Sequence, residues 1–247
     1  MDRTLDSLGD AVASLTERFA QRRAAIETGY RRLGADFPGM GEHWLNTRAL
    51  LRGTIDASEP TMLAYATIDT TPTLIGAGFV IVTRGDEQPS NVPGWPYAWH
   101  EHSGLFADES GVAPGKSGAT THVWVLHVWT ALPNPRGTFS PDNWALPFAR
   151  AGAAVPPGVD ADGARAYSLT VGGDMFLLQL LSDAGLVGDG RLARARSAIA
   201  RARGRASSWR SGDARELSAI WGDLHRELRS MLGARVDAYF RAPHANQ

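Results

Sequence analysis

The apolar residues near the start of the chain follow a helical period. Between Leu5 and Leu33 the large apolar side chains recur at steps of three or four residues, or at the sum of two such steps, as on one face of an amphipathic helix. They are Leu5, Leu8, Val12, Leu15, Phe19, Ile26, Tyr30 and Leu33. Pro38 and the glycines at 39 and 41 break the pattern. The spacing therefore predicts one long N-terminal helix within residues 1–36.

From residue 37 to residue 150 the pattern changes to one typical of β-structure. Segments rich in β-branched and aromatic residues are bounded by turn residues, and they lie at 62–68, 74–82, 97–103 and 121–129. No helical period separates these segments, so the sequence predicts an antiparallel sheet that curls into a barrel or a sandwich. The expected fold class is α+β, with this β core at 37–150.

The last part of the chain returns to a helical period. A linker rich in Gly, Ala and Pro at 151–166 is followed by apolar residues with helical spacing at 176–186 and at 217–236. Residues 167–242 are therefore predicted to form a helical region that packs on the β core or on the N-terminal helix.

Six arginines lie between Arg191 and Arg205, in the stretch that separates the last two predicted helices. They form either a phosphate-binding face or the solvated face of an alanine-rich helix. The stretch lacks interleaved aromatic residues and the chain has no net positive charge, so the solvated face is favoured.

The composition of the whole chain excludes several kinds of site and partner. The 247 residues carry a formal net charge of −1, which gives no support to nucleic-acid binding. The chain has no cysteine, which excludes thiolate nucleophiles, cysteine-based zinc sites, iron–sulfur clusters and disulfides, so a metal would be held by nitrogen and oxygen. The start does not resemble a signal peptide, and no apolar run is long enough to span a membrane. The protein is expected to be cytoplasmic, with neither a membrane nor a nucleic acid as partner.

The most informative local motif is Trp99-His100-Glu101-His102. In an extended strand, residues two apart point to the same side of the sheet. His100 and His102 can therefore approach one ion together, while Glu101 faces away.

A third imidazole is expected from the segment 121–129. His127 lies mid-strand among apolar neighbours, whereas His122 lies at the start of the strand near solvent, so His127 is preferred. Taken alone, His127 is more simply explained as a neutral core histidine bonded to a carbonyl. Together, His100, His102 and His127 favour one bound transition-metal ion, which would be zinc, iron or copper.

His43 is the next candidate. It follows a glycine-flanked turn, Gly39-Met40-Gly41-Glu42, where the backbone can come close to a ligand or to another strand. His43 is predicted to be a fourth metal ligand or a catalytic base beside the metal. Glu42 is the alternative for that role, and a plain surface position for His43 stays open.

The loop at 134–144 follows the His127 strand and carries two turn signals, although turn chemistry alone accounts for its Asn, Pro and Gly residues. Arg136 is predicted to be a catalytic group that orients a polar substrate, and Asn143 is predicted to contact that substrate. Tryptophans near these segments indicate either an aromatic-walled pocket or aromatic core packing. They are Trp44, Trp99, Trp129 and Trp144.

Several common catalytic motifs are missing from the sequence. It contains no Walker phosphate loop, no dinucleotide-binding fingerprint after a strand, no nucleophile elbow and no HExxH. Covalent serine catalysis therefore has no support.

Four islands of sequence resemble those of a group of uncharacterised bacterial proteins. They are Gly-Met-Gly-x-His-Trp at 39–44, His-x-His at 100–102, Leu-His-x-Trp at 126–129 and Asn-Pro-x-Gly-x-Phe-x-Pro-x-Asn at 134–143. The resemblance spans about 105 residues and implies a common site, without implying a reaction.

Two better-known families are similar in the spacing of their histidines. Cupins place a glutamate four or five residues after His-x-His, where this chain has Phe106 and Ala107, so Asp108 or Glu109 would have to substitute. The α-type carbonic anhydrases set His-x-His and a third zinc-binding histidine on neighbouring strands, with a gap close to the 25 residues found here. Both likenesses imply the geometry of a histidine-metal site on a β-sheet and no particular reaction.

The first hypothesis for function is a metal-dependent enzyme that activates water or dioxygen on a small-molecule substrate. The alternative is a non-catalytic barrel that binds haem or another small ligand, with one histidine as axial ligand. A third hypothesis is an interaction protein that forms a homodimer through its helices, with the histidines as core residues.

Overall fold

The computed structural model describes residues 3–84, 89, 99–102, 121–188, 190–210 and 212–240. The chain forms two compact units. We call the described residues up to Asn143 the sheet unit, and those from Trp144 onward the helical unit.

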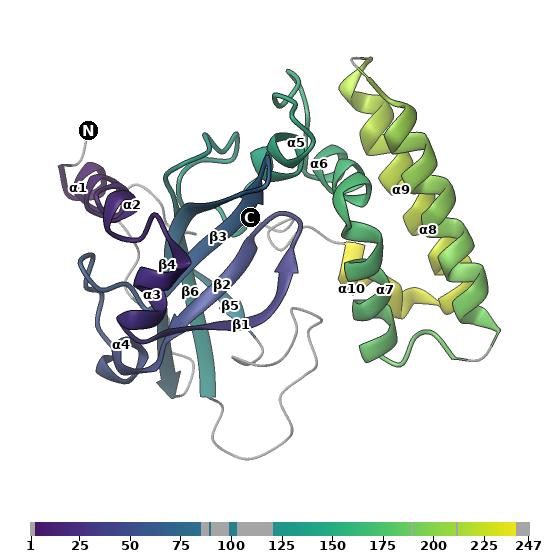
Figure 1. Ribbon diagram of the computed structural model, residues 1–247. Coiled ribbons are helices and arrows are strands. Elements are labelled where there is room, and N and C mark those ends of the chain that lie inside the picture. Colours follow the sequence, from purple (N-terminus) through teal and green to yellow (C-terminus); the bar gives the residue numbers. More distant parts are fainter. Residues whose placement is uncertain are drawn as a thin grey trace. The chain divides into compact units, whose positions relative to one another are not determined.

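The sheet unit is built on six antiparallel strands in the order β1-β2-β3-β4-β6-β5 (Figure 1). The strands are β1 (Tyr30–Phe37), β2 (Gly41–Asn46), β3 (Met62–Ile68), β4 (Thr71–Arg84), β5 (Trp99–His102) and β6 (Thr121–Trp129). Within the described residues β1 and β5 end the row of strands and do not pair with each other, so the sheet is open. The predicted barrel is therefore wrong, because closure would require these two end strands to pair, and the predicted sandwich is wrong because the described strands form one sheet.

The prediction of one long N-terminal helix is also wrong. The chain instead forms α1 (Arg3–Ala13), α2 (Leu15–Arg18) and α3 (Arg22–Glu27), and then enters β1. Gln21 is extended, and Gly29 adopts a positive φ of 99° that ends the last helix. The apolar spacing misled because Val12, Leu15 and Phe19 are all buried, although they lie in α1, in α2 and just after α2.

Strand prediction succeeded where the apolar character was continuous. The segments predicted at 62–68 and 121–129 coincide with β3 and β6, and that at 74–82 lies within β4. The segment predicted at 97–103 contains β5. Strands β1 and β2 were missed because polar residues interrupt them, even though five of the six residues of β2 are buried. Strand β2 leads into α4 (Thr47–Arg52), where the Asn46 side chain accepts hydrogen bonds from Arg48 N and Ala49 N.

The two faces of the sheet have different cores. On one face, residues of the N-terminal helices join an apolar cluster with alternate residues of the strands, among them Leu63, Phe79 and Leu126. On the other face, Met62 and Val80 pack in a smaller apolar cluster with further strand residues. Side chains alternate across a strand, so neighbouring residues of β6 serve different cores.

A buried tyrosine ties the N-terminal helices to the first of these faces. The Tyr65 hydroxyl donates a hydrogen bond of 2.7 Å to the Phe19 carbonyl. Burial raises the pKa of Tyr65 to about 12, and the nearby Arg22 guanidinium opposes part of that rise. The folded sheet unit therefore favours the neutral, protonated form of Tyr65.

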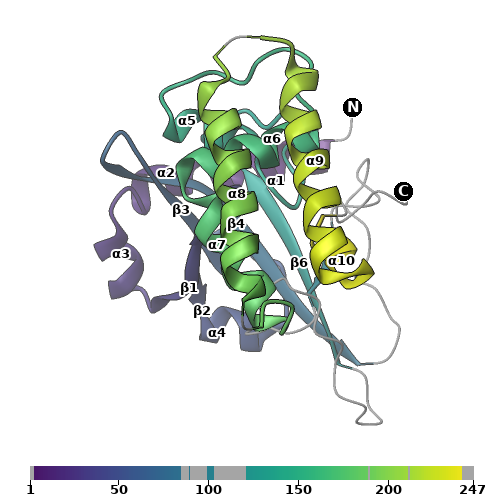
Figure 2. The same ribbon diagram turned by 90° about the vertical axis from the view of Figure 1, so that its right-hand side faces the viewer.

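The helical unit contains the helices predicted from the C-terminal period. Its elements are α5 (Ala145–Arg150), α6 (Ala161–Ser168), η1 (Leu169–Val171), α7 (Gly173–Asp183), α8 (Arg191–Ser208), α9 (Ala214–Leu232), η2 (Ala234–Val236) and α10 (Asp237–Phe240). Helices α8 and α9 lie side by side (Figure 2), and small residues such as Ala198 and large ones such as Leu224 belong to one shared core. Helix α6 begins inside the predicted linker at 151–166. None of the helices described here is long and apolar enough to cross a membrane.

Candidate functional site

Three buried imidazoles gather on the sheet face that carries Met62 and Val80. His43 comes from β2, His100 from β5 and His127 from β6, and their exposed fractions are 8%, 9% and 0%. The ring centre of His127 lies 5.4 Å from that of His43 and 5.1 Å from that of His100. His127 is thus the common neighbour of the other two rings.

The contact between His43 and His127 joins strands that are not neighbours. Strands β3 and β4 lie between β2 and β6, so a flat sheet would separate the two backbones by about 14 Å. The short distance between the rings shows that the sheet curves toward this face and that the side chains lean across it.

Small residues leave room for the two rings to meet. Ala64 lies opposite His43 in the strand register, and Gly78 lies opposite His127. A Cβ atom on Gly78 would lie 3.5 Å from His127 Cδ2 and 2.5 Å from Met62 Cε. Larger side chains at these two positions would occupy the space that the imidazoles share.

The strand register agrees with the alternation expected from sequence. His100 lies opposite Val125, and His102 lies opposite Val123, so both backbone positions belong to the face of His127. The side chain of His102 lies outside the described residues. His122 belongs to the other face of β6, where its ring stacks on Trp124 at 6.2 Å.

Aromatic rings flank the imidazoles at both sides. The Phe37 ring centre lies 5.4 Å from that of His43, and the Trp129 ring centre lies 5.1 Å from that of His127. Trp129 Nε1 donates a hydrogen bond of 2.7 Å to the Ser140 carbonyl, which fixes the indole. Of the tryptophans predicted to line a pocket, Trp129 is the one that the described structure places against an imidazole.

Trp44 and Trp99 lie elsewhere. Both belong to the core cluster on the opposite face of the sheet. Trp44 Nε1 donates to Glu42 Oε2 at 3.1 Å, and the same carboxylate forms ion pairs with Arg22 at 3.1 Å and Arg32 at 3.4 Å. The Glu42 carboxylate therefore lies on the sheet face opposite to that of the His43 ring.

The two loop residues predicted to contact substrate have different environments. Arg136 is exposed, and its backbone N–H donates to Asn134 Oδ1 at 3.1 Å. Asn143 is fully buried, and its Nδ2 donates to the Leu132 carbonyl at 3.1 Å. The Asn143 amide thus serves the main chain of its own loop.

Sequence reasoning missed Phe37 and the small residues beneath the rings. A usable signal existed, because Gly76 and Gly78 alternate within an otherwise apolar strand, as expected where another group approaches the backbone closely. A Cβ atom on Gly76 would lie 2.4 Å from the Val128 carbonyl oxygen.

Within the described residues, no group of three or more histidine, cysteine, aspartate or glutamate side chains is placed to hold a metal ion. The imidazoles are close, but the described structure does not gather three ligand atoms at one point. Of His102, only the backbone position, which the register places on the same face, lies within the described residues.

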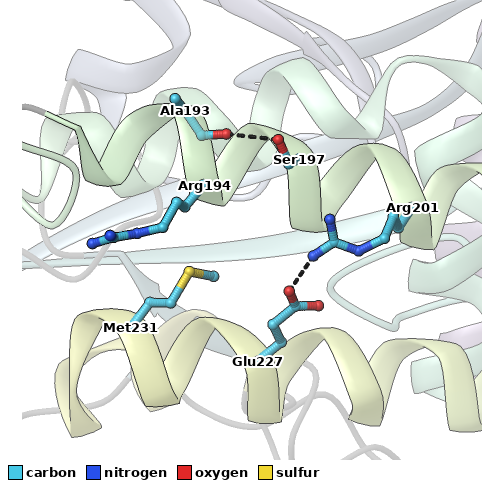
Figure 3. A pocket seen from close by; sticks show the side chains of 6 residues that line it. All are labelled: Ala193, Arg194, Ser197, Arg201, Glu227 and Met231. Carbon is cyan, nitrogen blue, oxygen red and sulfur yellow. Dashed lines mark hydrogen bonds and ion pairs between the residues drawn. The ribbon is translucent and has the colours of Figure 1, made fainter.

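The helical unit has a shallow groove of about 270 Å³ between α8 and α9 (Figure 3). It is lined by Ala193, Arg194, Ser197, Arg201, Glu227 and Met231. Its polar groups largely bond to one another: Arg201 pairs with Glu227, and the Ser197 hydroxyl donates to the Ala193 carbonyl at 3.0 Å. Among the lining side chains, Arg194 is drawn without a bond to the others (Figure 3).

Other arginines of α8 are engaged in the same way. Arg203 pairs with Asp174 at 2.6 Å, and Arg205 pairs with Asp223 at 2.7 Å. This arrangement agrees with the solvated face that the sequence favoured. His225 also lies in the helical unit, where its Nε2 is 2.8 Å from Asp237 Oδ1.

No protein-family profile, no curated protein and no solved structure matches the chain.

Proposed function

We propose that the imidazoles of His43, His100 and His127, together with His102, bind one transition-metal ion. The observation that supports this proposal is the spacing of 5.4 Å and 5.1 Å between the ring centres around His127. Two imidazoles that bind one tetrahedral ion through nitrogen at about 2.0–2.1 Å have ring centres about 5 Å apart. Small rotations of the rings, with His102 as a further ligand, would complete such a centre.

The surroundings of the rings support a shared ligand. Burying three polar rings on an apolar sheet face is unfavourable unless their nitrogen atoms are bonded, and one ion would bond one nitrogen of each ring. The chain has no cysteine, so the donors are nitrogen and oxygen, and imidazole ligands suit zinc, iron or copper.

We further propose that the centre makes the protein a metal-dependent enzyme for a small molecule. Zinc held by three histidines lowers the pKa of bound water to about 7, whereas iron or copper would activate dioxygen. Phe37 and Trp129 would exclude bulk water from two sides of the rings. Roles for Arg136 in orienting a polar substrate, and for His43 as base rather than ligand, stay predictions.

Elemental analysis of protein purified without a histidine tag tests the metal site directly. We expect one zinc, iron or copper ion per chain in the wild type, and well under half of that in His127→Ala. His122→Ala is the matched control, because this histidine lies on the same strand but on the opposite face. Its metal content should equal that of the wild type.

A measurement on the wild type protects this test against a variant that fails to fold. Metal-free protein is dialysed against zinc, ferrous iron or copper at micromolar concentration, and bound metal is counted. Failure to retain any of the three ions would overturn the proposal whatever the variants do. A Soret band in freshly purified protein would instead favour the alternative, a haem-binding protein with one imidazole as axial ligand.

A further inference from the structure

A loop connects the end of β6 to the turn between β1 and β2. We call residues 130–143 the strap. Its path is set by main-chain hydrogen bonds: Trp129 N donates to the Thr138 carbonyl at 2.9 Å, and Asn143 N donates to the Gly39 carbonyl at 2.8 Å. The strap thus spans from the strand of His127 to the turn that precedes His43.

Internal bonds stiffen the strap. Asn143 Nδ2 donates to the Leu132 carbonyl at 3.1 Å, and Asn134 Nδ2 donates to the Asp142 carbonyl at 2.7 Å. Asn143 is fully buried, so no water competes for its amide. The two asparagines therefore join the beginning of the strap to its end.

The turn that receives the strap controls where His43 lies. Gly41, two residues before His43, has a positive φ of 74°, and a Cβ atom there would lie 2.2 Å from the Tyr65 carbonyl oxygen. Strand β3 therefore fixes the turn from one side, and Asn143 fixes it at Gly39 from the other.

We infer that Asn143 is a positioning residue that sets the distance between the rings of His43 and His127. It acts through the strap, which holds the β1–β2 turn close to the end of β6 although two strands separate β2 from β6. The consequence for metal affinity rests on the proposed function, whereas the consequence for the spacing of the rings does not.

Histidine NMR on metal-free protein tests the inference without any metal. Asn143→Ala and Asn143→Asp both remove the donor to the Leu132 carbonyl. We expect the His43 ring resonances to shift and the contact between the His43 and His127 rings to weaken. We also expect zinc affinity to fall by about 10- to 100-fold, as for other residues that orient metal ligands.

Tyr65→Phe is the matched control. It removes a buried hydrogen bond from the opposite face of the same sheet and leaves the strap untouched. Both rings should keep their contact and their affinity for zinc in this variant. Should either Asn143 variant fail to fold, Asn134→Ala loosens the strap at Asp142 and should shift the same resonances by a smaller amount.

The two proposals can fail separately. An unchanged contact between the rings in folded Asn143→Ala protein would overturn the positioning role, whether or not metal binds. Wild-type protein that binds no zinc, combined with a contact that Asn143→Ala disrupts, would overturn the metal site and leave the positioning role standing.

Discussion

The two units differ in where they keep their polar side chains. Among the described residues, the polar and charged residues that are buried as a whole all belong to the sheet unit, whereas the helical unit buries only single polar atoms of larger side chains such as Trp221. They are Glu42, His43, Asn46, Thr61, His100, His127, Ser140 and Asn143. The core of the helical unit consists of alanine, larger aliphatic and aromatic residues, and three arginines of α8 lie outside it in ion pairs.

This difference predicts how the two units respond to substitution. A buried polar group destabilises a fold unless its partners are held in place, so natural proteins retain such groups mainly where they are fully bonded or useful. Surface ion pairs carry no such penalty and contribute little stability. We therefore expect substitutions in the sheet unit to have large, position-specific effects, and those on the surface of the helical unit to have small ones.

The largest contrast is expected between two glycine-to-alanine substitutions. Gly41→Ala places a Cβ 2.2 Å from the Tyr65 carbonyl oxygen at a positive φ, so it should destabilise the sheet unit by about 3 kcal/mol or more. Gly204→Ala lies on an exposed part of α8 with nothing within 4 Å of the new Cβ, so it should stabilise that helix by about 0.5–1 kcal/mol.

Hydrogen exchange detected by mass spectrometry measures both effects, because it reports on strand peptides and helix peptides separately. Faster exchange should appear in β2 and β3 for the first variant, and slower exchange in α8 for the second. Equal and small effects in the two variants would contradict the contrast between the units.

An intermediate effect is expected from alkaline pH. The folded state keeps Tyr65 protonated up to a pKa of about 12, whereas the unfolded chain releases that proton near the ordinary value of 10. The unfolded state therefore binds fewer protons between these values, and the stability of the sheet unit should fall by about 2 kcal/mol as the pH rises through this window.

Urea titrations from pH 8 to pH 12 measure this loss. Tyr65→Phe should be less stable than the wild type by about 1 kcal/mol at pH 8, since the bond to the Phe19 carbonyl is lost. Its stability should then decline less steeply with pH. A decline as steep as that of the wild type would show that Tyr65 does not carry the effect.

The smallest effect is expected at the helix surface. Arg201 and Glu227 pair across α8 and α9 with exposed side-chain fractions of 61% and 41%. A double-mutant cycle with Arg201→Ala and Glu227→Ala should give a coupling of less than about 1 kcal/mol, which 1 M salt should abolish. A larger coupling that persists in salt would place this pair among the well-ordered interactions of the molecule.

Sequence patterns predicted elements well where one period ran without interruption. Strands β3 and β6 and helices α7 and α9 follow from local alternation or helical spacing. The same reasoning failed at residues 5–33, where buried residues keep a helical spacing although Gln21 and Gly29 divide the chain. It also missed β2, because the polar residues Glu42 and His43 are buried by contacts with residues that lie far from them in the sequence.

The candidate site likewise contains residues that local patterns could place and one that they could not. Alternation within a strand was enough to place positions 100 and 102 on one face and to set His122 and His127 on opposite faces, whereas the choice of His127 came from its mid-strand position. It could not assign His43, because the approach of β2 to β6 depends on the space left by Gly78 and Ala64 and on the strap that ends at Asn143.

The sequence by itself determined the α+β class, the helical period of the C-terminal part, the common face of positions 100 and 102, and the opposite faces of His122 and His127. These properties depend on backbone geometry between near neighbours along the chain, which repeats every two or 3.6 residues. Only the tertiary structure decided that the sheet stays open and that His43 joins His127. Both depend on contacts between residues far apart in sequence, whose packing no local period encodes.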